Sequence, residues 1–332
     1  MVFHRLTRRQ LMFIGGAAAW PLGARSQPSD RMRRIGVLSI FSQSDAEPTA
    51  WLKAFQDELH KFGWEQGRDL QFENHFAGID SQRLRNSAAE LVAKNPDAIF
   101  AVTTLALAAL NQEAGAIPIV FVQVSDPVRL GFVTSLARPG GNITGFVTFE
   151  YQIGGKWLGL LRDTAPRTNR VAVLFDLENP SQPAYLEGIE AAAPTFGMEV
   201  MRARVRSAAE IEQTIHAFAQ QRNGGVLVVP SALAIRHYDV IIGVAAQSRL
   251  PAVYPYRKFA ESGGLISYGA DLHDAYRKAA SYIDRILRGA KTGDLPVQLA
   301  NKFELVVNLK TAKALGLTIP EPFLQQADEV IE

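Results

Sequence analysis

Small polar and aromatic side chains gather at the ends of the strands that this sequence predicts. In the first half they are Ser39, Phe41, Gln43, Thr103, Thr104, Gln123, Ser125 and Asp126. In the second half they are Asp176, Asn179, Ser231, Tyr254 and Tyr256, with Tyr268 in a later strand. Together they form a polar clamp with stacking surfaces. This set suits the binding of a small zwitterionic or aromatic ligand better than a reaction, which needs a paired nucleophile and base.

Several of these residues also have a purely structural interpretation. Thr103 and Thr104 could cap a helix that begins near residue 105. Asp126 precedes a proline and could start a turn or cap a helix. Tyr254 and Tyr256 could pack between two lobes instead of stacking on a ligand. At this point both interpretations stay open.

A catalytic set is absent from the sequence. The six histidines have no metal-ligand spacing, and no nucleophile elbow, P-loop or dinucleotide-binding glycine motif occurs. The chain has no cysteine, which excludes thiol catalysis and thiolate metal sites. We therefore predict a protein that is not an enzyme and that uses no metal ion and no cofactor.

The most conspicuous loop is Pro139-Gly140-Gly141-Asn142, which could be taken for a phosphate-binding loop. The residues after it, 143–147, have the pattern of a strand, whereas a phosphate loop leads into a helix. We predict a turn in which the two glycines supply backbone freedom.

The elements that must position these side chains occur in two similar halves. Residues 34–38 resemble 170–174, 98–102 resemble 225–229, and 117–121 resemble 250–254, in the same order and at similar offsets. Each half alternates short apolar runs, typical of buried parallel strands, with amphipathic helical segments. The expected strands are 34–39, 70–76, 98–102, 118–122, 171–175, 199–205, 225–229 and 252–254. The expected helices are 47–62, 81–94, 105–114, 181–196, 208–222 and 235–248.

This alternation predicts a two-lobed α/β protein in which each lobe has three layers. The remaining strands and helices, at 264–268, 272–288, 303–307 and 310–315, are too few for a third domain and should complete both lobes. The chain would then cross between the lobes three times. We expect one lobe from 34–147 plus 258–290 and the other from 148–257 plus 297–332. A ligand would bind in the cleft between them, beyond the carboxyl ends of the strands.

Residues 1–26 have the features of an export signal. They contain four arginines and no acidic residue, including the pair Arg8-Arg9, and an apolar run at 11–20 follows. Small residues at Ala24 and Ser26 predict cleavage after Ser26. The run is too short to span a bilayer comfortably, although a retained anchor is the alternative. We expect a periplasmic protein exported by a twin-arginine-type signal. Outside the leader no basic face indicates nucleic acid as a partner.

Several longer motifs carry a resemblance that covers the whole chain. They include Ser125-Asp126-Pro127-Val128, the run 137–145 (Ala-Arg-Pro-Gly-Gly-Asn-Ile-Thr-Gly), the runs 263–269 and 285–291, and the segment 302–316. With these motifs the chain resembles the substrate-binding proteins of ABC transporters, in the family that includes tryptophan- and tyrosine-binding members.

The resemblance implies a type I periplasmic binding fold with a hinge between the lobes. It also implies delivery of an amino acid or aromatic compound to ABC permease subunits, and we expect a monomer. Many members have an Asn-Pro-Asn-rich turn where this chain has Asp176 to Pro180, and the added carboxylates would favour a more cationic compound. The alternatives are a ligand-sensing periplasmic receptor and a two-lobed α/β enzyme.

Overall fold

The computed structural model describes residues 31–176 and 179–332. The predicted signal at 1–26 therefore lies outside the described residues. Within the described ranges, no helix combines the length and the apolar character needed to cross a membrane.

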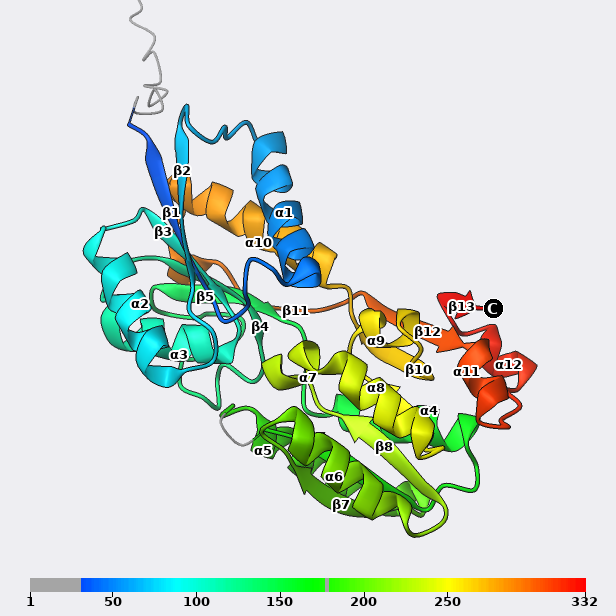
Figure 1. Cartoon of the computed structure of the whole chain (residues 1–332). Coiled ribbons are helices and arrows are strands. Elements are labelled where there is room, and N and C mark those ends of the chain that lie inside the picture. Colours follow the sequence, from blue (N-terminus) through cyan, green and yellow to red (C-terminus); the bar gives the residue numbers. More distant parts are fainter. Residues whose placement is uncertain (1–30, 177–178) are drawn as a thin grey trace, which may run out of the picture. The chain divides into compact units, whose positions relative to one another are not determined.

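The first sheet has six parallel strands in the order β11-β5-β4-β3-β1-β2. Its centre consists of buried apolar runs, because a parallel sheet is covered by helices on both faces. Helices α1 and α10 pack together on it, and α2 and α3 form a second pair (Figure 1). The strands are β1 (Arg33–Ser39), β2 (Leu70–Phe76), β3 (Ala98–Val102), β4 (Ile119–Val124), β5 (Ile143–Val147) and β11 (Gln298–Leu299). The helices are α1 (Ala46–Lys61), α2 (Ser81–Ala93), α3 (Thr104–Glu113) and α10 (Leu272–Leu287).

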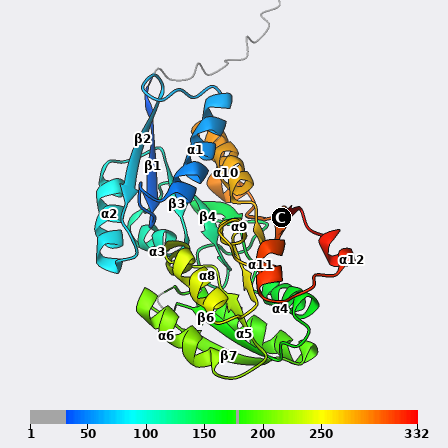
Figure 2. The same cartoon turned by 45° about the vertical axis from the view of Figure 1, so that its right-hand side comes forward.

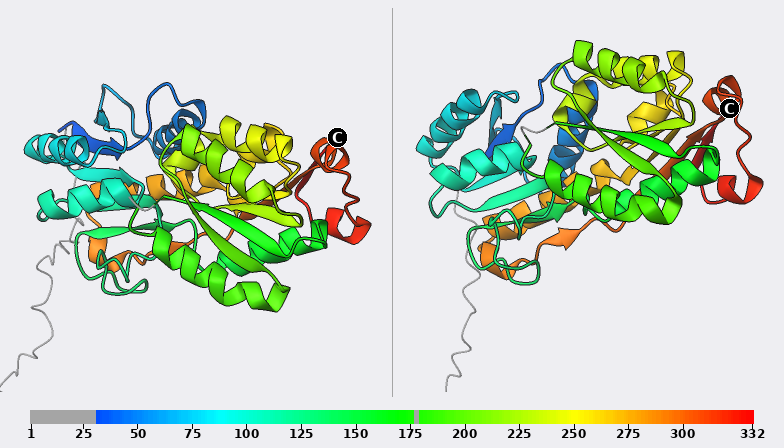
Figure 3. Two further views of the ribbon diagram at one scale, coloured as in Figure 1. Left: turned by 60° about the horizontal axis from the view of Figure 1, so that its bottom comes forward. Right: turned by 90° about the horizontal axis from the view of Figure 1, so that it is seen from below.

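The second sheet has seven strands in the order β13-β12-β10-β9-β8-β6-β7, and all its pairs are parallel except β10 with β12. Its strands have helices on both faces (Figure 3). The strands are β6 (Arg170–Phe175), β7 (Glu199–Arg204), β8 (Gly224–Val228), β9 (Ala252–Tyr254), β10 (Ile266–Ala270), β12 (Phe303–Asn308) and β13 (Glu329–Ile331). The helices are α4 (Ile153–Thr164), α5 (Gln182–Ala192), α6 (Ala208–Ala219), α7 (Ala232–Arg236), α8 (Tyr238–Gln247), α9 (Arg257–Glu261), α11 (Leu309–Ala314) and α12 (Glu321–Leu324).

These two sheets are the two α/β lobes predicted from the repeated halves. The eight expected strands all form, as β1 to β4 in the first sheet and β6 to β9 in the second. The four strands of each set occur in the same order within their sheet. In each sheet the first strand lies between the second and the third. The matching topology explains why the two halves have the same pattern of apolar runs.

The chain passes between the sheets three times: between β5 and α4, between β10 and α10, and between β11 and β12. The observed crossing points differ from the expected boundaries at 258 and 297. Residues 258–270 lie with the second sheet, because β10 pairs with β9 at Ile266 and Val253. Residues 298–299 lie with the first sheet, because β11 pairs with β5 at Gln298 and Phe146.

The Pro139–Asn142 segment is a turn that leads into β5, as predicted. Gly140 has a φ of 82°, a conformation that favours glycine, whereas Gly141 is not in this region. Asn142 closes the turn by donating from Nδ2 to the carbonyl oxygen of Ile117, at 2.7 Å.

Candidate functional site

A small cavity lies where strand ends of the two sheets meet. Its volume is about 30 Å³. From the first sheet it is lined by Ile40, Phe41, Thr103, Leu105 and Gln123. From the second it is lined by Asp176, Asn179, Pro230, Ser231, Ala232, Ile235 and Tyr256. Gln123 lies near the end of β4, and the others follow β1, β3, β6, β8 and β9, which is where open parallel sheets bind their ligands.

Thr103 lines the cavity in an unusual state. It precedes α3 and has a φ of 84°, which is a costly conformation for a β-branched residue. Its side chain makes no capping hydrogen bond, and the buried Oγ1 has no hydrogen-bond partner among the residues that the structure describes. The hydroxyl therefore does not act as the helix cap that its sequence position suggests. It remains available to a ligand, next to the backbone N–H groups of the first turn of α3, which an α-helix leaves without partners inside the helix.

Asp176 lines the cavity from the second sheet and is 7% exposed. Its loop is held by Gln182, which accepts from the backbone N–H of Asp176 at 3.3 Å and donates to the carbonyl oxygen of Pro230 at 2.7 Å. None of the residues that line the cavity in the described part of the chain is Lys, Arg or His. Asp176 is therefore the one charged side chain among the described residues of this lining.

Three other lining residues are held in place by local contacts. Gln123 has a φ of 56° and donates from Nε2 to the Tyr276 hydroxyl of α10, at 3.1 Å. Ser231 accepts from the N–H of Ala234 and so caps α7. Tyr256 is buried, and this burial raises the pKa of its hydroxyl, which stays protonated at neutral pH.

Other predicted residues lie beside the cavity or away from it. Ser39 accepts from the N–H of Phe41, Ser125 bonds to Tyr185, and Thr104 is buried in the first turn of α3. Gln43 is exposed, and its carbonyl oxygen accepts from Thr49.

The remaining three predicted residues have structural contacts instead of a place in the cavity lining. Asp126 accepts from the N–H of Arg129, as a turn starter does. Tyr254 stacks on Phe259 with centroids 4.8 Å apart, and Tyr268 stacks on Phe303 at 5.6 Å. Both tyrosines thus stack on rings of their own lobe.

The apolar part of the lining was not anticipated. Ile40 directly follows β1, whereas Leu105 lies in the first turn of α3 and Ala232 and Ile235 lie in α7. In a sequence such residues have the same appearance as core residues. Only Ile40 lies directly after a predicted strand, so the sequence carries no comparable signal for the other three.

Two polar contacts join the segment after β4 in the first lobe to α5 in the second lobe. Ser125, after β4, has its Oγ 2.6 Å from the hydroxyl of Tyr185 on α5. Arg129 forms a bidentate pair with Glu187 on the same helix, at 3.0 and 3.2 Å. Burial raises the pKa of Tyr185, so the hydroxyl stays neutral.

Comparison with known proteins places this geometry in context. A family model described as ABC transporter substrate binding protein matches residues 34–331. A tyrosine-binding protein from Clostridioides difficile (strain R20291) is 25% identical over 292 residues, which cover 87% of this chain and 82% of the relative.

Solved structures agree with that match. An ABC domain from Streptococcus pneumoniae in complex with L-Trp is 26% identical with a TM-score of 0.82, covering 90% of this chain and 100% of that one. A conserved domain protein from Vibrio cholerae has the same identity and coverage with a TM-score of 0.83. The predicted two-lobed binding-protein fold is thereby confirmed, and the matched family is one of binding proteins and not of enzymes.

Proposed function

The chain belongs to the ABC transporter substrate binding protein family, and on that premise we propose that its ligand is an amino acid held in the interlobe cavity for delivery to a membrane permease. The observation that carries the proposal is that a group that favours an anion and a group that favours a cation line the same cavity from different lobes. Thr103 at the start of α3 favours an anion, and Asp176 favours a cation.

An α-amino acid head group has the charges that this arrangement requires. Its carboxylate would accept from Thr103 Oγ1 and from backbone N–H groups at the start of α3. Its ammonium would bind the Asp176 carboxylate from the other lobe. The named ligands of two relatives, tyrosine and L-Trp, are amino acids and support this class.

The cavity volume indicates how binding takes place. A cavity of about 30 Å³ has room for only one or a few water molecules, which is too small for an amino acid head group. The lobes must therefore separate, or the lining must shift, before the ligand enters. Because the ligand would contact both lobes only when they are together, it would favour the closed state through differential affinity.

Ligand identification is the direct test. Mass spectrometry of ligand released from gently purified protein should detect an amino acid. Calorimetric titration should then show that Asp176→Asn weakens binding about tenfold or more, as loss of a hydrogen bond to a charged group does. Asp163→Asn is the matched control, since Asp163 is exposed on α4 and lines none of these cavities.

Two outcomes would contradict this assignment. Release of a sugar or another uncharged solute would remove the reason for the Asp176 carboxylate in the cavity. Equal affinities of the Asp176→Asn and Asp163→Asn variants would show that the ammonium binds elsewhere.

We also propose that the protein acts as a monomer in the periplasm, after export through its leader. The arginine pair at 8–9 and the small residues at 24 and 26 support this location. N-terminal sequencing of the protein recovered from a periplasmic fraction should begin at residue 27. An intact leader on that protein would contradict cleavage.

A further inference from the structure

The two lobes face each other along two edges, which the internal repeat makes equivalent. Helices α1 and α5 each follow the first strand of their sheet, and the segments after β4 and β9 each follow the fourth strand. At one edge, α5 of the second lobe meets the segment after β4 of the first lobe. At the other edge, the start of α1 in the first lobe faces the segment from α7 to α9 in the second (Figures 1 and 2).

The edge at α5, which we call the joined edge, is held by the two polar contacts described above. The stronger of them is the bidentate ion pair of Arg129 with Glu187. Next to Glu187, a Cβ atom built on Gly188 would lie 2.7 Å from the carbonyl oxygen of Tyr151, so α5 also packs closely against the first crossing between the lobes. The joined edge is therefore a natural pivot for movement of the lobes.

The edge at α1, which we call the unjoined edge, has the same signs of charge but no bond across it. Glu47 lies on α1 and Lys258 on α9, as Glu187 and Arg129 lie on the helix and the segment of the joined edge. Residues 44–51 and 235–259 are all described, and no hydrogen bond, ion pair or ring contact connects the two ranges. A cavity of about 290 Å³ lies between them instead.

Glu47 and Lys258 are placed to become partners. Both line this cavity and also a second one, of about 380 Å³, beside the crossing from β10 to α10. Each side chain is partly buried, and in the described part of the chain neither forms an ion pair or a hydrogen bond. Partial burial without a partner removes water from a charge without compensation, which pairing would restore. The other carboxylates of the second cavity already bind Arg257 or Lys302; they are Glu261, Asp271 and Glu304.

We propose that Glu47 and Lys258 form a second interlobe latch, which pairs when the lobes close on the ligand. The inference rests on the proposed function, because that function requires a ligand held between the lobes. Rotation about the joined edge would bring the start of α1 to α9 and shorten the distance between the carboxylate and the ammonium group. The pair would then exist only in the closed state, so it would slow the release of ligand.

Charge reversal with rescue tests the latch. The probe is isotopically labelled L-tryptophan, since a related ABC domain has been solved in complex with it. Lys258→Glu places two carboxylates opposite each other and should weaken binding about threefold or more, through faster release after dilution. The double variant Glu47→Lys with Lys258→Glu restores opposite charges and should bind within about twofold of wild type. Rescue of this kind requires that the two side chains meet.

Lys310→Glu is the matched control. It makes the same change of charge in the second lobe, but Lys310 is exposed on α11 and lines neither cavity, so the release rate should not change. Lys258→Gln is the second variant if charge reversal impairs folding. Its difference from wild type should shrink between about 0.1 and about 1 M salt, because the screening length falls from about 10 to about 3 Å.

The outcomes separate the latch from the proposed function. Absence of rescue in the double variant, or equal effects of Lys258→Glu and Lys310→Glu, would overturn the latch and leave the amino-acid function in place. Rescue of Glu47→Lys by Arg277→Glu would also overturn it, because Arg277 lines the second cavity from the same lobe as Glu47. Binding of no amino acid by wild type would instead overturn the proposed function. The same variants, measured with the solute recovered from the purified protein, would then decide the latch.

Discussion

Thr103 and Thr144 are both buried, but their hydroxyl groups have different surroundings. Thr144 lies in β5, where its Oγ1 donates to the carbonyl oxygen of Leu295 at 2.6 Å. Thr103 Oγ1 has no hydrogen-bond partner within residues 31–176 and 179–332, and Thr103 lines the cavity. A buried hydroxyl without a partner costs free energy in the folded state, so its retention at a ligand cavity is consistent with a role in binding.

Replacement of each threonine by valine should therefore have opposite consequences. Thr103→Val should leave the free energy of unfolding within about 1 kcal/mol of wild type, because no hydrogen bond is lost. It should weaken ligand binding about tenfold. Thr144→Val should destabilise the fold by about 1–3 kcal/mol, because it leaves the Leu295 carbonyl unsatisfied, and should leave affinity unchanged.

Urea unfolding and calorimetric titration of the two variants measure both quantities. Unchanged affinity in Thr103→Val would remove Thr103 from the proposed head-group contacts. A loss of stability as large as that of Thr144→Val would show that its hydroxyl has a structural partner.

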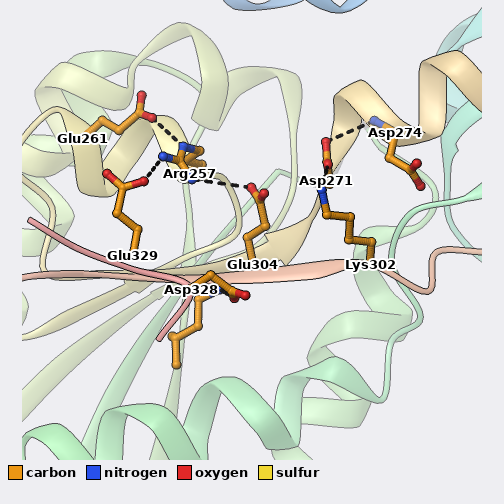
Figure 4. Close-up of polar contacts among 9 residues, drawn as sticks. Arg257, Glu261, Asp271, Asp274, Lys302, Glu304, Asp328 and Glu329 are labelled. Atoms are coloured by element: carbon orange, nitrogen blue, oxygen red, sulfur yellow. Dashed lines mark hydrogen bonds and ion pairs between the residues drawn. The ribbon is translucent and has the colours of Figure 1, made fainter. Parts of the chain in front are cut away.

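At the scale of elements, two of the three lobe crossings are joined by an ion pair. Asp271 precedes α10 and caps it by accepting from the N–H of Asp274 at 3.0 Å. The same carboxylate bonds to Lys302, just before β12, at 2.6 Å (Figure 4). Close by, Arg257 pairs with Glu261, Glu304 and Glu329, which connects α9 to β12 and β13. The Asp271–Lys302 pair thus links two consecutive crossings, whereas the Arg257 pairs lie within the second lobe.

The Asp271 pair should contribute stability that depends on pH. Burial alone would raise the pKa of Asp271, but the bonds from Lys302 and from the Asp274 N–H outweigh it and lower the pKa below its ordinary value. A carboxyl group whose pKa is lower in the folded state stabilises the fold at pH values above its pKa in the unfolded chain, which is about 3.9. This stabilisation is lost as the pH falls through the folded-state pKa.

Asp271→Asn should keep the helix cap, since asparagine is a good capping residue, and lose the ion pair. We expect it to lower the free energy of unfolding by about 0.5–1 kcal/mol at pH 7. The difference from wild type should disappear as the pH falls below about 4. Urea unfolding from pH 7 to 3 measures this. Asp57→Asn, in the exposed Lys53 pair of α1, should have a smaller effect. A difference that grows toward low pH would contradict the assigned sign.

At the scale of the whole molecule, the contacts between lobes should set the balance between open and closed states. Tyr185→Phe removes only the hydroxyl that bonds to Ser125 across the lobes. If this bond exists only in the closed state, its loss should weaken ligand binding by up to about tenfold, which corresponds to about 1.4 kcal/mol. Small-angle scattering should show that more ligand is needed to reach the compact state.

Tyr282→Phe is the control for that experiment. The Tyr282 hydroxyl donates to the carbonyl oxygen of Pro296 at 2.7 Å, and both residues lie with the first sheet. Its loss should lower stability without changing affinity. If both variants bind ligand as wild type does, the Ser125–Tyr185 contact does not distinguish the two states.

The local pattern of the sequence was sufficient to predict the strands of the two sheets and about half of the residues that line the cavity. Buried runs such as 98–102 and 171–175 identify parallel strands because both faces of such strands are covered by apolar side chains. Once the strands are located, the rule that ligands bind beyond their carboxyl ends indicates Phe41, Thr103, Asp176 and Ser231. These predictions depend only on residues close together in the chain.

Only the tertiary structure decided the features that depend on distant pairing. The place of β10 beside β9, and of β11 beside β5, follows from strand pairing that local periodicity does not encode. The same is true of Tyr254 and Tyr268, whose rings stack on Phe259 and Phe303. It is also true of Trp51 and Tyr238, which line one cavity although they lie 187 positions apart in the sequence. Hydrophobic periodicity is a local property, whereas the convergence of side chains on one cavity is a property of the packed chain.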